Sequence, residues 1–317
     1  MPSTHQPMPE LIAVKSDFDR FHEWEAAFKH YGIEAIPWNE RQSRRNDIRY
    51  ALVWQPEPGS LAALPSLEVI FSIGAGVDHL KGDNIAPDGI PVVRMVEDSL
   101  TAGMVEFVVY NVLQFHRQMD FYQHNQRKHV WQPRMQSAAW DRTVGILGLG
   151  VLGSAAGQLL RQLQFNVLGW SRTEKHVDGI QSYFGNNQLS TFLSRCEFLV
   201  CLLPLTDATK GMVNRKLLSQ LPKGAFFINA GRGPVVNDHD LLSALDSGQL
   251  EGAALDVFNQ EPLPPDSPYW GHDKVIVTPH IASITLPGTS AKHVAENIQR
   301  HRESKPLLYL ADLSLGY

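Results

Sequence analysis

The chain has 317 residues, of which 43% are hydrophobic and 19% are charged, and its formal net charge is −5. A length beyond about 250 to 300 residues favours two domains, and this apolar fraction suffices for two buried cores. The acidic balance argues against nucleic acid or an anionic membrane surface as a partner, because both attract a basic field.

The beginning of the chain and its cysteines give expectations about location. The first ten residues lack a basic segment followed by an apolar one, so we expect no signal peptide. No apolar run in the sequence is long enough to predict a membrane span. Cys196 and Cys201 are the two cysteines, and their spacing fits neither a disulfide framework nor a zinc site. We therefore expect no metal site and a cytoplasmic protein.

Two series of strand-like segments follow one another along the chain. Each segment is short, rich in β-branched or aromatic residues, and followed by Gly, Pro or polar residues. Nearly continuous apolar strands separated by helix-length segments are typical of parallel sheets covered by helices on both faces. The first series comprises residues 11–14, 50–54, 67–71 and 91–96, and the second comprises 143–147, 165–170, 198–203, 225–229, 252–257 and 275–278.

A long helical pattern over residues 101–129 separates the two series and is interpreted as a domain connector. Another helical pattern follows the last expected strand, but this final segment is too short to form a domain by itself. We expect it to pack on the N-terminal part of the chain. The predicted fold class is α/β with two doubly wound parallel-sheet domains. One is discontinuous and comprises residues 1–103 and 285–317, and the other comprises residues 104–284.

Gly148, Gly150 and Gly153 form a GxGxxG pattern between an apolar strand and an Ala/Leu-rich segment. This context is typical of a dinucleotide-binding turn, in which the first glycine permits the turn and the second admits the pyrophosphate. The third allows the helix to pack closely on the strand. N–H groups at the start of the helix would bind phosphate oxygens, which adds Val151 and Leu152 to the predicted cofactor site. The alternative is a glycine turn in a domain without a ligand.

The end of the second strand in this series reads Gly169-Trp170-Ser171-Arg172-Thr173. Sites specific for NAD usually carry Asp or Glu near this point to bind the ribose 2′-hydroxyl, and neither is present here. Ser171 and Arg172 instead offer a hydroxyl and a cation, which suit a 2′-phosphate. The segment predicts NADP(H) in preference to NAD(H). The alternative is that Arg172 is only a solvated loop residue.

Three later segments, which contain Arg232, Glu261 and His280, each lie at the carboxyl end of an expected strand. Ligands of open α/β sheets bind at these ends. Arg232 would bind a substrate carboxylate and polarise the neighbouring carbonyl. His280 would protonate the developing alkoxide, and Glu261 would hold the imidazole. The set is suited to the reduction of a 2-oxo acid by hydride transfer.

In combination, these segments resemble the D-isomer-specific 2-hydroxyacid dehydrogenases along nearly the whole chain, and most of all the bacterial glyoxylate/hydroxypyruvate reductases. The resemblance implies a Rossmann cofactor domain inserted in a discontinuous flavodoxin-like substrate domain. It also implies reduction of glyoxylate to glycolate and of hydroxypyruvate to glycerate, and a homodimer. The segments that carry it, besides those above, are residues 51–58, 71–78, 241–248 and 256–264.

The resemblance implies roles for individual residues as well. Arg232 would orient the substrate, His280 would be the acid and base, and Glu261 would be the carboxylate partner of the histidine. Trp54, which follows a strand, would line the substrate site, although a packing role is an equal alternative. The loop whose backbone N–H groups would bind the substrate carboxylate consists of Gly74, Ala75, Gly76 and Val77.

Further residues match family positions along the cofactor. Met104 corresponds to a residue packed against the nicotinamide, but its apolar helical face is equally consistent with a plain core position. Asp256 corresponds to a residue near the nicotinamide ring or its carboxamide, and a capping role is its alternative. The remaining matches are Leu203, Pro204, Thr209, Ala230, Gly231 and Ala282.

Two other functions remain open at this point. A nucleotide-sensing binding module uses the same fold, but it is usually marked by partner-binding extensions, and the Arg, Glu and His set favours chemistry. A related dehydrogenase acting on a different 2-hydroxy acid would share every motif above. The residues that line a pocket cannot be derived from the sequence, so substrate size stays open.

Overall fold

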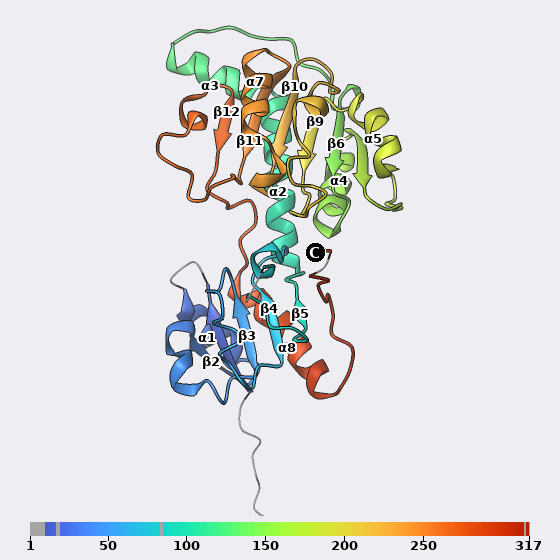
Figure 1. Ribbon diagram of the computed structural model, residues 1–317. Helices are drawn as coiled ribbons and strands as arrows, with labels where there is room; N and C mark the ends of the chain where they lie inside the picture. The colour runs from blue at the N-terminus through green and yellow to red at the C-terminus, as the bar shows by residue number, and fades with distance from the viewer. Residues whose placement is uncertain (1–9, 17–19, 83–84, 314, 317) are drawn as a thin grey trace, which may run out of the picture. The chain divides into compact units, whose positions relative to one another are not determined.

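The computed structural model describes residues 10–16, 20–82, 85–313 and 315–316 (Figure 1). The chain divides into two compact units, Met1–Leu100 with Thr285–Tyr317, and Thr101–Ile284. The first boundary thus falls after Leu100, whereas the sequence-based expectation places it after residue 103. The second falls at the expected position. The division lies inside the first turn of a helix, a place where no sequence pattern changes.

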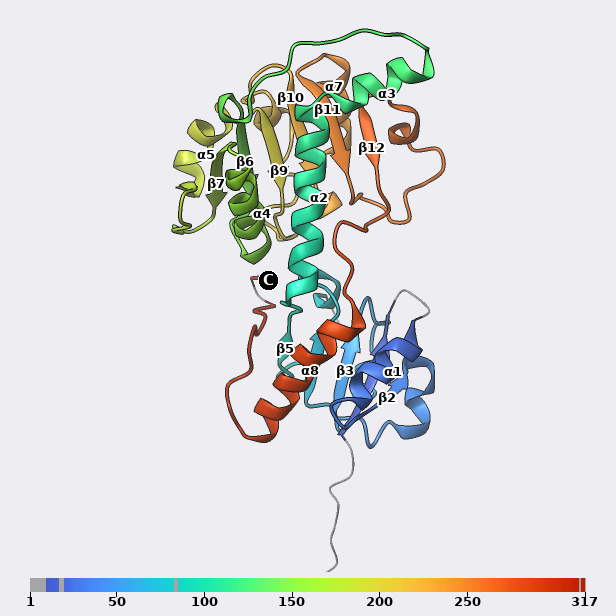
Figure 2. The ribbon, with the colours of Figure 1, turned by 180° about the vertical axis from the view of Figure 1, so that it is seen from behind.

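The first unit contains one parallel sheet with the order β2-β1-β3-β4-β5 (Figure 1). This is the flavodoxin-like doubly wound order. Helices α1 (Phe21–Lys29) and α8 (Pro287–Arg302) lie side by side on one face of the sheet, and their apolar side chains share a core with it (Figure 2). The strands are β1 (Glu10–Lys15), β2 (Ile33–Pro37), β3 (Tyr50–Val53), β4 (Val69–Ser72) and β5 (Val92–Val93).

The second unit contains a seven-stranded parallel sheet with the order β12-β11-β10-β9-β6-β7-β8. Counted within the unit, the first six strands have the Rossmann order, and β12 adds a seventh at one edge. The strands are β6 (Thr143–Leu147), β7 (Asn166–Ser171), β8 (Gln181–Phe184), β9 (Phe198–Cys201), β10 (Ala225–Asn229), β11 (Leu250–Leu255) and β12 (Val275–Val277). Together with the five-stranded sheet, this confirms the predicted fold class.

Helices cover both faces of the seven-stranded sheet (Figure 2). Apolar side chains of α2 (Asp98–His116) and α4 (Val151–Gln162) form a core with one face. Those of α5 (Gly185–Leu193) and α7 (Asp238–Asp246) form a core with the other face. The remaining helices are α3 (Met119–Arg127), α6 (Arg215–Leu218) and the short 3₁₀ helices η1 (Trp38–Arg44), η2 (Asp78–Leu80), η3 (Ala139–Asp141), η4 (Gly233–Val235) and η5 (Pro268–Gly271).

The structure differs from the sequence-based expectation at three elements. Strands β2 and β8 are absent from the prediction because both lie at sheet edges and neither is a continuous apolar run: β2 contains a glutamate and ends in proline, and β8 begins with two polar residues. The connector expected over residues 101–129 is two helices, because Gln118 has a left-handed backbone with φ of 55°. In the described ranges, no helix has the length and apolar character needed to cross a membrane.

Candidate active site

His280 and Glu261 form an ion pair at the carboxyl ends of neighbouring strands of the second unit. His280 follows β12 and Glu261 follows β11. The imidazole Nδ1 lies 2.7 Å from Glu261 Oε2, and the two side chains are 33% and 31% exposed. The other carboxylate oxygen of Glu261 accepts the N–H of Phe258 at 2.9 Å. Because an ionised carboxylate only accepts, Nδ1 carries the proton in this contact, and a proton exchanged with a substrate would pass through Nε2.

The surroundings of Glu261 keep its side chain ionised. Burial alone would raise the pKa of this carboxyl group, but the hydrogen bonds from His280 and from the N–H of Phe258 outweigh it, so the pKa is lowered. The positive charge of Arg232 acts in the same direction. The three predicted catalytic residues are thus brought together electrostatically within one unit. A negative Glu261 is the state that can hold and orient an imidazolium.

Asp256 anchors the loop that carries His280. The residue is 0% exposed, and both of its carboxylate oxygens are used. Oδ1 accepts the Thr278 hydroxyl at 2.6 Å and the N–H of Ile281 at 2.9 Å, and Oδ2 accepts the N–H of Ala282 at 2.8 Å. The carbonyl of Asp256 also accepts the N–H of His280 at 2.8 Å. Its side chain therefore anchors a distant loop rather than capping the segment that follows it, which was the alternative given above, and its contact with a cofactor stays a prediction.

His280 itself has a backbone φ of 54°, a left-handed conformation that is unfavourable for residues with a Cβ. Such strain persists only where neighbouring contacts over-determine it, and the bonds from residues 278, 281 and 282 to Asp256 supply those contacts. The sequence analysis did not identify Thr278 as part of this arrangement. Its position two residues before a strand-end histidine is the only local signal.

Arg232 directly follows the turn after β10 and is half-buried. Its Nη1 donates to the carbonyl of Gly231 at 2.9 Å, and this bond holds one side of the guanidinium group against the loop that carries it. A Cβ on Gly231 would lie 2.7 Å from the carbonyl oxygen of Leu203, and one on Gly233 would lie 1.9 Å from the backbone of Phe258. The glycines on both sides of Arg232 therefore allow its loop to pack closely against the backbones of Leu203 and Phe258. This packing fixes the position of the Arg232 backbone.

The glycine loop between β6 and α4 fits a dinucleotide. Gly148 has φ of 106°, and a Cβ on Gly153 would lie 2.0 Å from the carbonyl oxygen of Gly148, so both positions require glycine for the protein's own packing. A Cβ on the exposed Gly150 would meet nothing within 4 Å, which leaves open space where a pyrophosphate would approach. In the described ranges, the N–H groups of Val151, Leu152 and Gly153 have no protein acceptor. They form a helix N-terminus suited to phosphate oxygens.

Ser171 ends β7 and Arg172 follows it, at the same edge of the sheet. The carbonyl of Trp170 accepts the N–H of Gly148 at 2.9 Å, which ties this strand end to the glycine loop. Ser171 is buried, and its hydroxyl donates to the carbonyl of Thr173 at 2.7 Å, so its proton is used within the loop. Arg172 is exposed. Of the two residues predicted to recognise a 2′-phosphate, Arg172 is therefore the stronger candidate.

Residues predicted along the nicotinamide and adenosine lie in two places of the same unit. Met104, Ala230 and Ala282 are buried members of one core cluster, so a packing role for Met104 is established and ring contact stays a prediction. Leu203 and Pro204 follow β9, and the hydroxyl of Thr209 donates to the carbonyl of Pro204 at 2.6 Å. In the part of the chain that the structure describes, no group of three or more metal-ligating side chains is found.

In the first unit, the backbone of residues 74–77 forms a separate candidate site. Ser72 Oγ lies 3.0 Å from the carbonyl oxygen of Gly74 and 2.9 Å from that of Gly76. In a trans peptide the N–H points opposite to the C=O, so the N–H groups of Ala75 and Val77 point away from Ser72. No described residue accepts the N–H groups of residues 75, 76 and 77. Successive outward N–H groups of this kind form a concavity that suits an anion.

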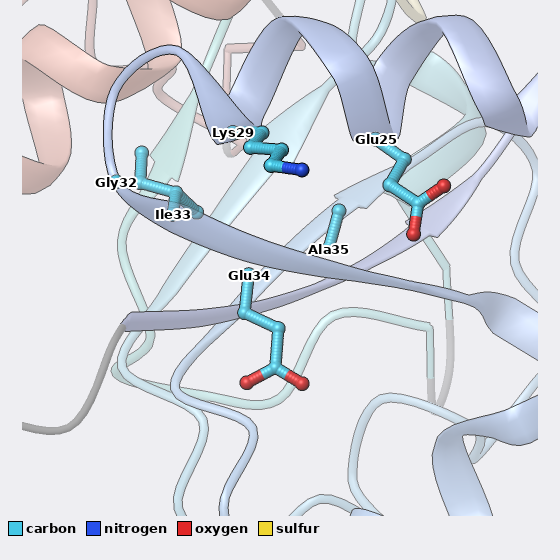
Figure 3. A pocket seen from close by; sticks show the side chains of 6 residues that line it. All are labelled: Glu25, Lys29, Gly32, Ile33, Glu34 and Ala35. Atoms are coloured by element: carbon cyan, nitrogen blue, oxygen red, sulfur yellow. The ribbon is translucent and has the colours of Figure 1, made fainter.

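A surface hollow elsewhere in the first unit has no part in this chemistry. It lies between α1 and β2, has a volume of about 380 Å³, and is lined by Glu25, Lys29 and Glu34, among others (Figure 3). Figure 3 shows that Glu25 and Lys29 come from α1 and that Glu34 comes from β2. It contains none of the residues described above, and its position offers no support for a binding function.

The pair formed by Glu261 and His280 predicts a pH-dependent stability difference. A carboxyl group whose pKa is lowered on folding stabilises the fold above its ordinary pKa, and this stabilisation is lost as the pH falls through the folded-state value. Replacing Glu261 with glutamine should cost on the order of 1 kcal/mol of unfolding free energy at neutral pH. Urea unfolding of both proteins should show this difference shrinking as the pH falls below about 4. A difference that stays constant or grows would contradict the assignment.

Comparisons with known proteins agree with this geometry. A family model described as "D-isomer specific 2-hydroxyacid dehydrogenase, NAD binding domain" matches residues 109–282. The chain is 41% identical over 309 residues to glyoxylate/hydroxypyruvate reductase A of Yersinia enterocolitica, covering 92% of this chain and 99% of the relative.

Solved structures are similar along nearly the whole chain. A D-isomer specific 2-hydroxyacid dehydrogenase from Xanthobacter autotrophicus Py2, in complex with NADPH and MES, has a TM-score of 0.93 and 38% identity, covering 98% of this chain and 100% of that one. An NADPH-dependent glyoxylate/hydroxypyruvate reductase from Sinorhizobium meliloti, in complex with NADP and sulfate, has a TM-score of 0.91 and 40% identity, covering 97% and 100%.

Proposed function

The chain belongs to the D-isomer-specific 2-hydroxyacid dehydrogenase family, and on that premise we propose that it uses NADPH to reduce glyoxylate to glycolate and hydroxypyruvate to glycerate. The observation that carries the proposal is the 2.7 Å contact between His280 Nδ1 and Glu261 Oε2 at the carboxyl edge of the sheet. A pair of this kind supplies a proton donor, which a nucleotide-sensing module does not need. The two reductases named above support the choice of substrates.

The proposed mechanism assigns one task to each side chain. NADPH, when bound at the glycine loop, supplies the hydride. Arg232 binds the substrate carboxylate and polarises the carbonyl, and His280 donates a proton from Nε2 to the substrate oxygen. Glu261 holds the imidazole through Nδ1, which fixes its orientation and stabilises its charged form. Asp256 keeps the backbone of His280 in the conformation that this contact requires.

Residues of the first unit are proposed to bind the substrate. The outward N–H groups of Ala75 and Val77 bind the substrate carboxylate, and Gly76 contributes its own N–H beside them. A side chain at position 74 is excluded because a Cβ would lie 2.8 Å from Trp54 Cζ3. Trp54 is half-buried and forms a wall of the same loop. These assignments follow from the unused N–H groups and from the family resemblance of this segment.

We propose that the cofactor is bound with a preference for NADP(H) over NAD(H) through Arg172. Loss of a charge-assisted hydrogen bond costs about 1.5 to 3 kcal/mol, so Arg172→Ala should weaken NADPH binding by roughly tenfold to a hundredfold. NADH binding should be almost unchanged, because NADH lacks the 2′-phosphate. Titration of both cofactors by nucleotide fluorescence measures the two constants. Lys175→Ala, which removes another exposed cation of the loop, is the matched control, and equal weakening of both cofactors would refute the role of Arg172.

A second copy of this chain is the proposed protein partner. In the segment between α3 and η3, which contains no helix or strand, Trp131 is 97% exposed and Met135 is 93% exposed. The segment is nevertheless held in place, because the Arg134 guanidinium lies 3.4 Å from the centre of the Phe121 ring. A fixed backbone that presents large apolar side chains suits a protein interface. Light scattering should give the molar mass of a dimer, and Trp131→Ser should shift it toward the monomer. A monomeric wild-type protein would overturn this proposal.

The cytoplasmic location is proposed from the state of the cysteines. Cys196 and Cys201 are both free and buried, and burial raises the pKa of each thiol. Buried, protonated thiols are compatible with a reducing compartment.

The activity is tested by following the absorbance of the reduced nicotinamide. Purified protein is mixed with NADPH or NADH and with glyoxylate, hydroxypyruvate, pyruvate or a bulkier 2-oxo acid. Oxidation of NADPH with glyoxylate and with hydroxypyruvate is the expected result. Turnover only with a bulkier acid would identify a related dehydrogenase. Tight NADPH binding without turnover on any acid would favour the sensing module.

A further inference from the structure

Two residues that the proposed mechanism does not use, Ser72 and His79, lie beneath the substrate-binding loop of the first unit. We propose that they are positioning residues for substrate binding. Ser72 sets the direction of the N–H groups that bind the carboxylate, and His79 sets the position of the Trp54 ring. The inference rests on the proposed function, because it takes the ligand of residues 74–77 to be the carboxylate of a 2-oxo acid.

The loop needs an external restraint because two of its residues are glycines. Gly74 and Gly76 have access to more backbone conformations than other residues, so the peptide units that follow them can rotate at little cost. A rotation of either unit would turn its N–H inward and its carbonyl outward. An outward carbonyl would repel a carboxylate. The loop sequence alone therefore does not specify an anion site.

Ser72 supplies this restraint. Its hydroxyl lies within 3.0 Å of both glycine carbonyl oxygens and also accepts the N–H of Gly74 at 3.2 Å. The residue is 0% exposed, so water does not substitute for the hydroxyl. The N–H of Met95 adds a second bond to the Gly74 carbonyl at 3.2 Å. The Gly76 carbonyl has no other donor among the described residues, so its direction depends on Ser72 alone.

His79 connects this hydroxyl to Trp54. Its Nε2 lies 3.5 Å from Ser72 Oγ, and its ring centre lies 4.3 Å from that of Trp54 at an angle of 42°. On another side, Trp54 Cζ3 fills the space that a Cβ on Gly74 would need. The indole is thus held between a side chain from η2 and the backbone of the loop. If either His79 or the Gly74 backbone moved, the Trp54 ring would change its position beside the N–H groups of the loop.

The consequence concerns binding rather than chemistry. The N–H groups contact the substrate carboxylate, which keeps its charge throughout the reaction, so their loss weakens the ground state and the transition state alike. Such a change raises KM and leaves kcat almost unaltered. By contrast, a residue with a purely structural role lowers the folded fraction and the melting temperature, without changing the KM of the molecules that remain folded.

Ser72→Ala tests the first part in the full-length enzyme with NADPH. We expect the KM for glyoxylate to rise by about tenfold or more, kcat to change by less than about threefold, and the NADPH dissociation constant to stay the same. Ser60→Ala is the matched control, because Ser60 is also buried and donates to a backbone carbonyl, that of Glu57, away from the loop. An unchanged KM in Ser72→Ala, or a KM that rises equally in the control, would overturn the inference.

His79→Ala and His79→Phe test the second part. Phenylalanine keeps a ring against Trp54, whereas alanine removes it. The KM for glyoxylate should rise in the alanine variant and return to within about threefold of the wild type in the phenylalanine variant. Equal KM values in the two variants would show that the ring contact does not position Trp54.

Binding of oxalate separates this inference from the proposed function. Oxalate carries the same carboxylate but undergoes no reduction, and calorimetry measures its affinity for the NADPH complex. If the wild-type enzyme reduces no 2-oxo acid, the proposed function fails, and weaker oxalate binding by Ser72→Ala would still support the inference. If the enzyme is active and Ser72→Ala binds oxalate as tightly as the wild type, the inference fails alone. Absence of oxalate binding to the wild type would also overturn it.

Discussion

Replacement of His280 with alanine should lower kcat for glyoxylate by about two to four orders of magnitude, the range over which a positioned acid contributes. Of the three residues proposed to act in catalysis, His280 is the one that can release a proton to the substrate oxygen, since Glu261 is ionised and Arg232 does not release a proton. The NADPH dissociation constant should be unchanged, because the glycine loop follows a different strand.

Steady-state kinetics and cofactor titration on the same preparation check this result. His272→Ala is the matched control, because His272 also belongs to the second unit and also faces a carboxylate, with Nε2 3.4 Å from Asp246. Its kcat should stay within about threefold of the wild type, as for most substitutions outside the site. Turnover by His280→Ala at the wild-type rate would remove the proposed proton donor. A parallel loss in both variants would indicate a stability effect.

The proximity of the three candidate catalytic residues could be predicted because its signals are local. Arg232, Glu261 and His280 each follow an apolar strand within a few residues. In a parallel sheet all carboxyl ends lie at one edge, so three separate local patterns converge without knowledge of any long-range contact. The glycine loop was predictable for the same reason. Its strand, turn and helix are consecutive, and the structure shows a distinct spatial reason for Gly148 and for Gly153.

The residues that hold the loops of the two candidate sites could not be predicted in the same way. Ser72 acts on carbonyl groups whose direction depends on the path of the loop, and the sequence shows only a serine at the end of an apolar strand. Asp256 accepts three hydrogen bonds from a segment more than 20 residues later, which only the pairing of β11 with β12 brings near. Strand β8 was missed because its sequence begins with two polar residues and does not match a buried strand.

Substitution of Asp256 should therefore affect stability and catalysis together. Asp256→Ala leaves the Thr278 hydroxyl and the N–H groups of Ile281 and Ala282 without their acceptor inside the protein. A hydrogen bond to a charged group contributes about 1.5 to 3 kcal/mol, and of the three donors only the N–H of Ala282 belongs to a buried residue, so we expect a loss of about 3 to 5 kcal/mol in unfolding free energy. In the molecules that fold, His280 is no longer held at its left-handed φ, and kcat should fall by at least about tenfold.

Graded variants distinguish this anchoring role from cofactor contact. Thr278→Val removes one donor and keeps the carboxylate, so its loss in stability should be about 1 kcal/mol, smaller than that of Asp256→Ala. Asp256→Asn keeps the shape but places an amide donor against a backbone N–H or a hydroxyl, so its loss should lie between the two. Urea unfolding and kcat per folded enzyme should follow the same order across the series. If Asp256→Asn keeps full stability and instead weakens NADPH binding, Asp256 contacts the cofactor and does not chiefly hold the His280 loop, because a structural anchor would not change cofactor affinity alone.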